Sequence, residues 1–466
     1  MKYSLALDLG ATSIRGILGY IEDGKLKTEE ILRFSHERIK EDGRSRWDWN
    51  KIIKNIEETI LKYGNNLASI GVDTWGVDFG ILDNNGELLE KPVSYRDEYN
   101  ITGFKAAQQN LSLHDIFMHT GNQIMPINTL FQLLALKEEN RNYKNISTVL
   151  MMPDLINYYL TGNKFSEITI ASTTQLFELE NNKFSEKILD TYSINKNIFP
   201  EIITPGKIIG STKNSKLKSI RKFDIPIIST ASHDTASAVL LTKAYTDNDT
   251  LFLSCGTWSL IGCLSDKPII TDQAFKNSLT NETGYNSSNM FFKNITGLYI
   301  FEKLKSQLEK KYKRDISFEE ITEHVKNCNI EDTFDVEKDI FQVDEFDVIK
   351  EINKIIKKEL TNDFDYFKIV YKSLVKKYEE TVKQISEILK KDFKCLHIIG
   401  GGAKSTFLCK MIADNLAIDV IAGPFEATAY GNLLVQKIAL NEIKTLNEGF
   451  DLITKTTEIT EFKVKK

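Results

Sequence analysis

Apolar residues follow two spacings along this chain, and their alternation predicts an α/β fold. Short runs rich in Leu, Ile and Val, such as 5–9, 225–228 and 395–399, predict buried strands. Residues 49–60 and 367–385 instead carry apolar side chains at helical spacing, as expected of helices that cover a sheet. Strands that alternate with helices in this way are typical of a parallel or mixed sheet with helical layers.

One hydrophobic pattern occurs twice, which indicates two related domains. Residues 5–18 match residues 251–264 at a constant offset of 246, with Leu, Gly and Ser at the same places. Each copy reads as strand, glycine-containing turn and strand, which predicts a β-hairpin with a polar tip. The offset is far larger than the roughly 20 to 50 residues of solenoid repeats. We therefore predict an N-terminal domain over 1–245 and a C-terminal domain over 246–466.

The tips of the two predicted hairpins carry groups that suit phosphate. Turn glycines expose backbone N–H groups, and Thr12, Ser13 and Thr257 add hydroxyl donors. Arg15 would add charge-assisted hydrogen bonds. Asp8 ends an apolar strand before the first tip, where it is either a turn aspartate or a carboxylate that holds Mg²⁺ through water. The second copy has a serine at the matching place, which favours a specific role for Asp8.

The segment 225–239, between the two copies, is a candidate catalytic element. It predicts a strand that leads through Ser232, His233, Asp234 and Thr235 into a helix. Either Ser232 or Asp234 caps that helix, or Asp234 is a catalytic carboxylate held by a rigid element. Its place between two phosphate-binding hairpins favours catalysis.

Two more acids interrupt the apolar residues of 68–83. Asp73 and Asp78 flank Trp75 and Gly76. A glycine there suits close approach of the backbone to a ligand. The alternative is a bulge stabilised by local hydrogen bonds.

Composition argues against several other classes of protein. The 60 basic and 65 acidic residues give a net charge of −5, so we expect no nucleic-acid partner. The five cysteines and six histidines show no C-x-x-C pair and no metal-ligand spacing, which fits reduced thiols in the cytoplasm. We find no signal peptide and no run of about 18 apolar residues, so we expect no membrane partner. Monomer and homodimer both stay open.

A set of motifs, taken together and in order, resembles the FGGY family of carbohydrate kinases, and within it the kinases that act on L-rhamnulose. The motifs lie at 8–13, 72–79, 92–97, 125–130, 232–237, 256–260 and 400–402. A single one would be weak evidence, but the ordered set spans nearly the whole chain. It is therefore highly specific.

The resemblance implies two actin-like, ribonuclease H-like ATPase domains with a deep cleft between them, the first holding sugar and the second mainly ATP. It implies Mg²⁺-assisted phosphorylation of L-rhamnulose at the 1-hydroxyl by ATP. Asp234 matches the family's catalytic base. The positions that match sugar contacts are Gly76, His233, Thr235 and Asn294, and those that match ATP contacts are Ala11, Thr12, Ser13, Ile14, Arg15, Thr257, Glu302 and Gly402.

Two of these positions depart from the family pattern. Ile14 stands where glycine is common, and Glu302 stands where glutamine is common. Loss of glycine removes freedom at positive φ, and a carboxylate near the nucleotide would repel phosphate. Both departures concern ATP geometry rather than the base.

Two alternatives to an L-rhamnulose kinase stay open. One is a kinase for another ketose, such as L-fuculose or xylulose, because sugar choice depends on a few hydroxyl contacts. The other is a non-catalytic protein with the same fold, either a sugar sensor or a chaperone-like ATPase, since fold does not fix function. A sensor would be expected to lose Asp234 or Asp8.

Overall fold

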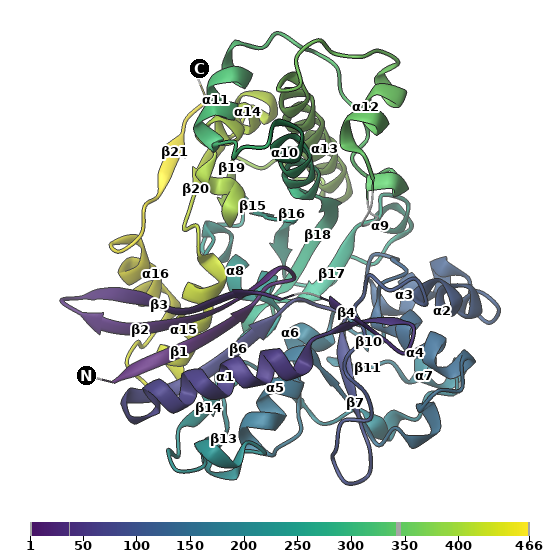
Figure 1. Ribbon diagram of the computed structural model, residues 1–466, viewed down its shortest axis with the longest axis vertical. Helices are drawn as coiled ribbons and strands as arrows, with labels where there is room; N and C mark the ends of the chain where they lie inside the picture. The colour runs from purple at the N-terminus through teal and green to yellow at the C-terminus, as the bar shows by residue number, and fades with distance from the viewer. Residues whose placement is uncertain (1, 37, 342–345, 465–466) are drawn as a thin grey trace. The chain divides into compact units, whose positions relative to one another are not determined.

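The computed structural model describes residues 2–36, 38–341 and 346–464 (Figure 1). The chain forms two compact units. The first comprises Met1–Leu241, Ser265–Phe291 and Ala427–Thr457, and the second comprises Thr242–Leu264, Phe292–Glu426 and Glu458–Lys466. These units differ from a single division after residue 245 because helix α15 (Ala427–Ala439) packs on strands of the first sheet. The division at 245 stays a prediction for the two family domains.

The first unit is built on a sheet with the strand order β13-β14-β6-β1-β2-β3. Its strands are β1 (Tyr3–Leu9), β2 (Ser13–Glu22), β3 (Lys25–Ser35), β6 (Leu67–Thr74), β13 (Ile208–Ser211) and β14 (Pro226–Ile228). β1, β6 and β14 run parallel, whereas β1 and β2 form the first predicted hairpin. The carboxyl ends of the three parallel strands therefore lie at one edge of the sheet, where ligands bind in open α/β folds.

Strand alternation gives this sheet one apolar face and one polar face. Apolar residues of β1 and β6 pack in one core with α1 (Trp49–Tyr63) and α5 (Met152–Thr161). On the other face, Gln436 of α15 accepts a hydrogen bond from Ser69 Oγ (2.7 Å). A Cβ on Gly71 would lie 2.5 Å from Asn432 Oδ1, so glycine lets α15 approach the strand. Asp8 and Asp73 share this polar face by the two-residue period of a strand.

The first unit contains further helices and strands, and some of them form a second apolar core. The helices are α2 (Asn100–Ala107), α3 (Leu113–Thr120), α4 (Thr129–Glu138), α6 (Ile168–Ala171), α7 (Glu186–Thr191), α8 (Asp234–Val239), α9 (Asp272–Lys276) and α16 (Leu446–Thr454). The strands are β4 (Arg38–Glu41), β5 (Arg44–Trp47), β7 (Phe79–Leu82), β8 (Thr148–Met151), β9 (Ser166–Glu167), β10 (Phe177–Glu178), β11 (Lys183–Phe184), β12 (Ile202–Ile203) and β17 (Thr280–Thr283).

The second unit repeats the hairpin on six neighbouring strands of a seven-stranded sheet, in the order β18-β16-β15-β19-β20-β21. Its strands are β15 (Thr250–Cys255), β16 (Trp258–Ser265), β18 (Asn289–Thr296), β19 (Cys395–Ile399), β20 (Asp419–Ala422) and β21 (Thr460–Phe462). β15 and β16 form the second predicted hairpin, and β15, β19 and β20 are parallel. The helices are α10 (Tyr299–Tyr312), α11 (Phe318–Asn327), α12 (Val348–Ile356), α13 (Asp365–Leu389) and α14 (Thr406–Leu416).

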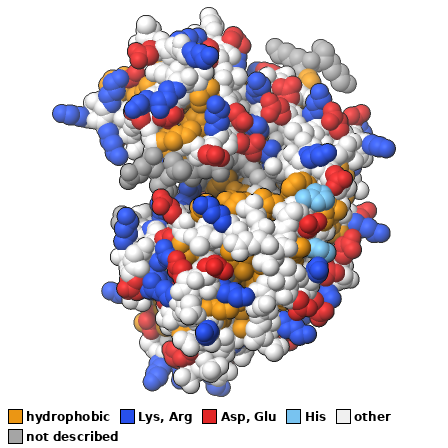
Figure 2. All heavy atoms as spheres, turned by 90° about the vertical axis from the view of Figure 1, so that its right-hand side faces the viewer, with side chains coloured by type: hydrophobic (Ala, Val, Ile, Leu, Met, Phe, Trp, Pro, Cys, Tyr) orange, Lys and Arg blue, Asp and Glu red, His pale blue; other side chains and the backbone are white. Residues whose placement is uncertain are grey.

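Figure 2 shows charged side chains of both signs, with hydrophobic and uncharged areas between them. On the face drawn in Figure 2, Lys and Arg are interspersed with Asp and Glu among the described residues. Within the described part of the chain, no helix has both the length and the apolar character that crossing a membrane requires.

Candidate active site

Asp234 begins helix α8, directly after the loop that follows β14. His233 is the N-cap residue, and its side chain makes no capping hydrogen bond. Ser232 Oγ donates to the Thr230 carbonyl at 3.3 Å instead of capping the helix. The Thr74 N–H donates to the Ser232 carbonyl at 2.9 Å, which ties this loop to the end of β6. Asp234 thus stands at the carboxyl edge of the parallel strands with 28% of its side chain exposed, within reach of a ligand.

The surroundings of Asp234 give it a pKa close to neutrality. Burial raises the pKa of Asp234 to about 6, against the opposite effect of nearby His233. His233 Nε2 lies 3.5 Å from Asp234 Oδ1, and His233 Nδ1 lies 3.1 Å from Glu282 Oε2. Burial alone would lower the pKa of His233, but the two carboxylates outweigh it and the net pKa is raised. A carboxylate with a pKa near the working pH is suited to general-base catalysis.

Glu167 holds the loop before Asp234 in place. Its Oε2 accepts hydrogen bonds from the Ser232 N–H (3.1 Å) and from Thr169 Oγ1 (2.5 Å). Thr169 Oγ1 in turn accepts from the His233 N–H at 3.1 Å. Burial raises the pKa of Glu167 to about 7 even though several donors favour its charged form. Glu167 is therefore a positioning residue for the segment that carries the base.

Gly76 lies beside His233, so two of the predicted sugar-binding positions come together. A Cβ on Gly76 would lie 3.4 Å from His233 Nε2 and 3.3 Å from the Thr173 side chain. Val77 has a φ of 66°, a rare conformation for a β-branched residue. Its carbonyl accepts a hydrogen bond from Thr129 Oγ1 at 2.6 Å. Backbone strain of this kind persists only where surrounding structure supports it, and it concentrates at ligand sites.

Thr235 is buried next to the base. Its Oγ1 donates to Asp234 Oδ1 at 3.3 Å. The Thr235 hydroxyl therefore points at the Asp234 carboxylate. The same residue also occupies a position that matches a sugar contact in the family.

Asp78 has a structural role that agrees with the alternative of local hydrogen bonds. Its Oδ2 accepts from Trp47 Nε1 (2.6 Å), Trp75 Nε1 (2.9 Å) and the Tyr95 N–H (3.2 Å). Gln132 Nε2 donates to Oδ1 at 3.1 Å. Burial nevertheless raises the pKa of Asp78 to about 6.

Asp8 and Asp73 are direct neighbours on β1 and β6. Burial raises the pKa of Asp8, against the effect of Arg15, whose Nη2 lies 2.5 Å from Asp8 Oδ2. Burial and the Asp8 charge hold the pKa of Asp73 well above its usual range. Asn432 Nδ2 donates to Asp73 Oδ2 at 2.5 Å. The predicted Mg²⁺ ligand, Asp8, and the predicted phosphate contact, Arg15, therefore form an ion pair with each other.

The first hairpin tip accommodates Ile14 without strain. The Gly10 N–H donates to the Ser13 carbonyl at 2.9 Å, which closes the turn over Ala11 and Thr12. Ile14 is already a strand residue, paired with Leu9, and its side chain is fully buried in the core. The loss of glycine at this position is therefore offset by packing.

In the second unit, the hairpin tip meets the start of α10. The Leu298 N–H donates to the Gly256 carbonyl (2.9 Å), and the Tyr299 N–H donates to the Thr257 carbonyl (3.2 Å). Glu302 lies in the first turn of that helix, where burial raises its pKa. A Cβ on Gly402 would lie 2.2 Å from Cys255 Sγ, so glycine is required where this loop crosses the end of β15.

Asn294 lies on β18, and its side chain is partly buried. It belongs to the second unit, whereas the other three predicted sugar-binding positions belong to the first.

Two functional candidates, Glu167 and Glu282, were not expected from the sequence. Both are carboxylates within otherwise apolar or uncharged buried strands, β9 and β17. That burial pattern is the only local signal for them. Their partners, Ser232 and His233, are distant in sequence, so only the fold shows what these carboxylates contact.

Comparison with known proteins identifies the family. The description "FGGY family of carbohydrate kinases, N-terminal domain" matches residues 3–240, and the corresponding C-terminal domain matches residues 359–440. The chain belongs to the FGGY family of carbohydrate kinases. It is accordingly a sugar kinase, and the prediction of the family from the ordered motifs is confirmed.

Curated relatives of this FGGY kinase match over nearly its whole length. A protein named rhamnulokinase from Halalkalibacterium halodurans is 35% identical over 463 residues, covering 97% of each chain. A rhamnulokinase from Bacillus subtilis is 34% identical over 470 residues, covering 99% of this chain and 95% of the relative.

Solved structures confirm the predicted fold. The xylulose kinase from Lactobacillus acidophilus superposes with a TM-score of 0.80 at 17% identity, covering 100% of this chain and 94% of that one. The Plasmodium falciparum glycerol kinase gives a TM-score of 0.79 at 16% identity, with the same coverage. This FGGY kinase therefore has two actin-like α/β ATPase domains, as the family resemblance implies.

Proposed function

We propose that this FGGY kinase transfers the γ-phosphoryl group of ATP to the 1-hydroxyl of L-rhamnulose, giving L-rhamnulose 1-phosphate and ADP. The observation that carries the proposal is the Asp234 carboxylate, partly exposed at the end of a strand and with a pKa of about 6. The curated relatives named rhamnulokinase support the choice of ketose. The reduced state of all five cysteines agrees with a cytoplasmic location.

Asp234 acts as the general base. It takes the proton from the 1-hydroxyl while that oxygen attacks the γ-phosphorus, and the bond to the β-γ bridging oxygen of ATP breaks. Phosphoryl transfer depends mainly on positioning and charge neutralisation, so a single base suffices. Gly76, His233 and Thr235 around Asp234 would hold the sugar hydroxyls.

ATP contacts are proposed in each unit separately. Ala11 to Arg15 at the first hairpin and Thr257 with Gly402 in the second unit are proposed as ATP contacts. Asp8 is proposed to hold Mg²⁺. The site fits that ion because Asp8 and the neighbouring Asp73 place carboxylate oxygens on the same face of the sheet, and Mg²⁺ prefers oxygen ligands. Bound Mg²⁺ would supply neutralisation of phosphate charge.

Release of ADP with MgATP and a panel of sugars tests this function. The panel contains L-rhamnulose, L-fuculose, D- and L-xylulose and glycerol, and Asp234→Asn serves as the control. We expect the highest kcat/KM with L-rhamnulose, and loss of turnover but not of sugar binding in the variant. Preference for another ketose would replace the substrate. Sugar binding without any ADP release would support the sensor instead.

A further inference from the structure

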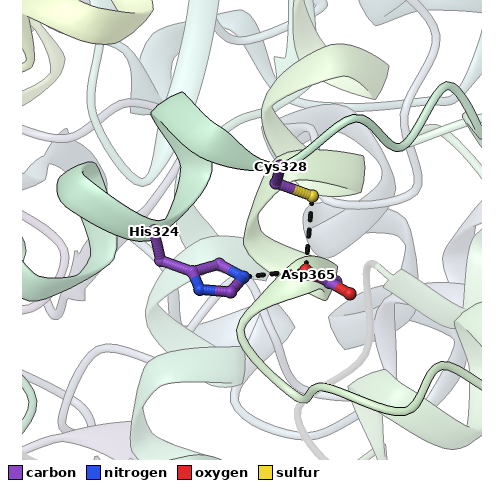
Figure 3. Close-up of side chains that lie close together, drawn as sticks. All are labelled: His324, Cys328 and Asp365. Atoms are coloured by element: carbon purple, nitrogen blue, oxygen red, sulfur yellow. Dashed lines mark hydrogen bonds and ion pairs between the residues drawn. The ribbon is translucent and has the colours of Figure 1, made fainter.

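Three side chains with metal-binding atoms converge in the second unit, on residues that the kinase reaction does not use. His324 lies in the last turn of α11, Cys328 follows the end of that helix, and Asp365 begins α13. Their ligand atoms all lie within 4.8 Å of one another. Figure 3 shows the Asp365 carboxylate between the imidazole and the thiol, with a contact to each. The spacing of cysteines and histidines gave no indication of this group, because the third member is 37 residues from Cys328.

We propose that His324, Cys328 and Asp365 form a binding site for a transition-metal ion of the Zn²⁺ class. The donor set is an imidazole nitrogen, a thiolate sulfur and a carboxylate oxygen, which are the three ligand types that zinc uses in proteins. Oxygen-preferring ions such as Mg²⁺ would not select the sulfur. The site is separate from the proposed Mg²⁺ site at Asp8.

The distances suit a tetrahedral ion after a small adjustment. Asp365 Oδ1 lies 2.7 Å from His324 Nε2 and 3.3 Å from Cys328 Sγ. With ordinary zinc bond lengths, the ligand atoms of a tetrahedral site are separated by about 3.4 to 3.6 Å. A rotation of the Asp365 carboxyl group away from the imidazole would open the shorter distance to that value. Three protein ligands leave the fourth position to water, which can reach the site because the His324 side chain is 28% exposed.

The two helices favour the charges that such a site needs. His324 lies at the carboxyl end of α11, where the helix dipole favours a cation. Asp365 lies at the amino end of α13, where the dipole favours a carboxylate. Burial raises the pKa of the Cys328 thiol, and Lys368, one turn further along α13, has the opposite effect. On binding, Cys328 releases its proton, and the proton on His324 Nε2 moves to Nδ1 through solvent.

The structural alternative is that Asp365 only accepts hydrogen bonds and joins the two helices. Zn²⁺ binding to the untagged full-length chain, measured by equilibrium dialysis with a non-thiol reductant, distinguishes the two. We expect one equivalent of Zn²⁺, and a loss of affinity of about tenfold or more in His324→Ala, Cys328→Ser and Asp365→Asn. Two matched controls, His119→Ala and Asp363→Asn, should bind as the wild type does.

Co²⁺ gives a second, spectroscopic measurement of the same site. Bound to the wild-type chain, it should show the near-ultraviolet charge-transfer absorption of a cobalt–thiolate bond, and Cys328→Ser should abolish this absorption. Absence of stoichiometric Zn²⁺ binding would overturn the proposal. So would zinc or cobalt binding that all three ligand variants retain.

Discussion

The pair formed by Glu282 and His233 should control the pH dependence of catalysis through Asp234. The base must be ionised to accept a proton, and its pKa is raised to about 6. About nine tenths of the molecules carry the ionised base at pH 7 and about a tenth at pH 5, so kcat/KM should fall about tenfold between them. This acid limb of the pH profile is expected because protonation removes the ionised, active form of Asp234.

Glu282→Gln is expected to move this limb toward higher pH. Without the carboxylate 3.1 Å from its Nδ1, buried His233 would lose its proton more easily. Asp234 would then lack the cation 3.5 Å away that favours its ionised form. Two unit charges at that distance interact by about 5 kcal/mol at an effective dielectric constant of about 20. This is an upper limit, because His233 is only partly protonated near its own pKa and Asp234 reaches solvent.

A rise of the Asp234 pKa to about 7 would use only about 1.4 kcal/mol of that interaction. The ionised fraction at pH 6 would then fall from about one half to about one tenth, a roughly fivefold loss of kcat/KM. At pH 8 the loss from this cause would be about a tenth. The assay is ADP release at subsaturating ketose and saturating MgATP, over pH 5 to 9 in buffers of constant ionic strength.

Asp272→Asn is the matched control for Glu282→Gln. It removes a carboxylate from a different histidine, His114, at 2.7 Å and on an exposed surface. Its pH profile should match the wild type. An unchanged limb in Glu282→Gln, or an equal loss of activity at every pH, would refute the coupling through His233.

Three further outcomes are expected. Gly76→Ala should raise KM for the ketose more than it lowers kcat and leave KM for ATP unchanged, because its methyl group would lie 3.4 Å from His233 Nε2. Steady-state kinetics with each substrate varied in turn measures both KM values. A raised KM for ATP with an unchanged KM for the ketose would place Gly76 at the nucleotide instead. Glu302→Gln should lower KM for ATP by removing a negative charge near the proposed phosphate contacts, and an unchanged KM would separate this position from the nucleotide. Glu167, whose pKa is about 7 in the folded chain, stabilises it at low pH, and this contribution of up to about 3 kcal/mol is lost as pH rises through about 7. Urea unfolding at pH 5 and 8 should show a smaller difference for Glu167→Gln than for the wild type.

The hairpins and the long amphipathic helices could be predicted from the sequence because their signals are local. Both hairpins, α1 and α13 appear where the apolar spacing places them. Helices α10 and α11 were not predicted, because the region from 304 to 347 is highly charged and its apolar residues are sparse. Helix α12 begins just after this region and was not predicted either. Helix α16, which follows α15, was not predicted from the sequence.

The site divides in the same way between local and distant information. Asp234 could be predicted because a strand, a polar segment and a helix follow one another in sequence. The contacts that influence its pKa could not be predicted, because Glu282 contacts His233 from β17, a strand that lies far from Asp234 in the sequence. The role of Asp78 was undecided for a similar reason, since Trp47 and Gln132 lie on separate elements.

Three acids lie at the ends of neighbouring parallel strands in the first sheet. Asp8, Asp73 and Asp234 follow or end three adjacent parallel strands, and each charge disfavours the ionisation of a neighbour. Such an arrangement opposes folding, because buried like charges are unfavourable without a partner. α15 offsets part of this cost through Asn432, and Arg15 offsets another part through Asp8. The remaining electrostatic demand is for a cation, which agrees with the proposed Mg²⁺ site at Asp8.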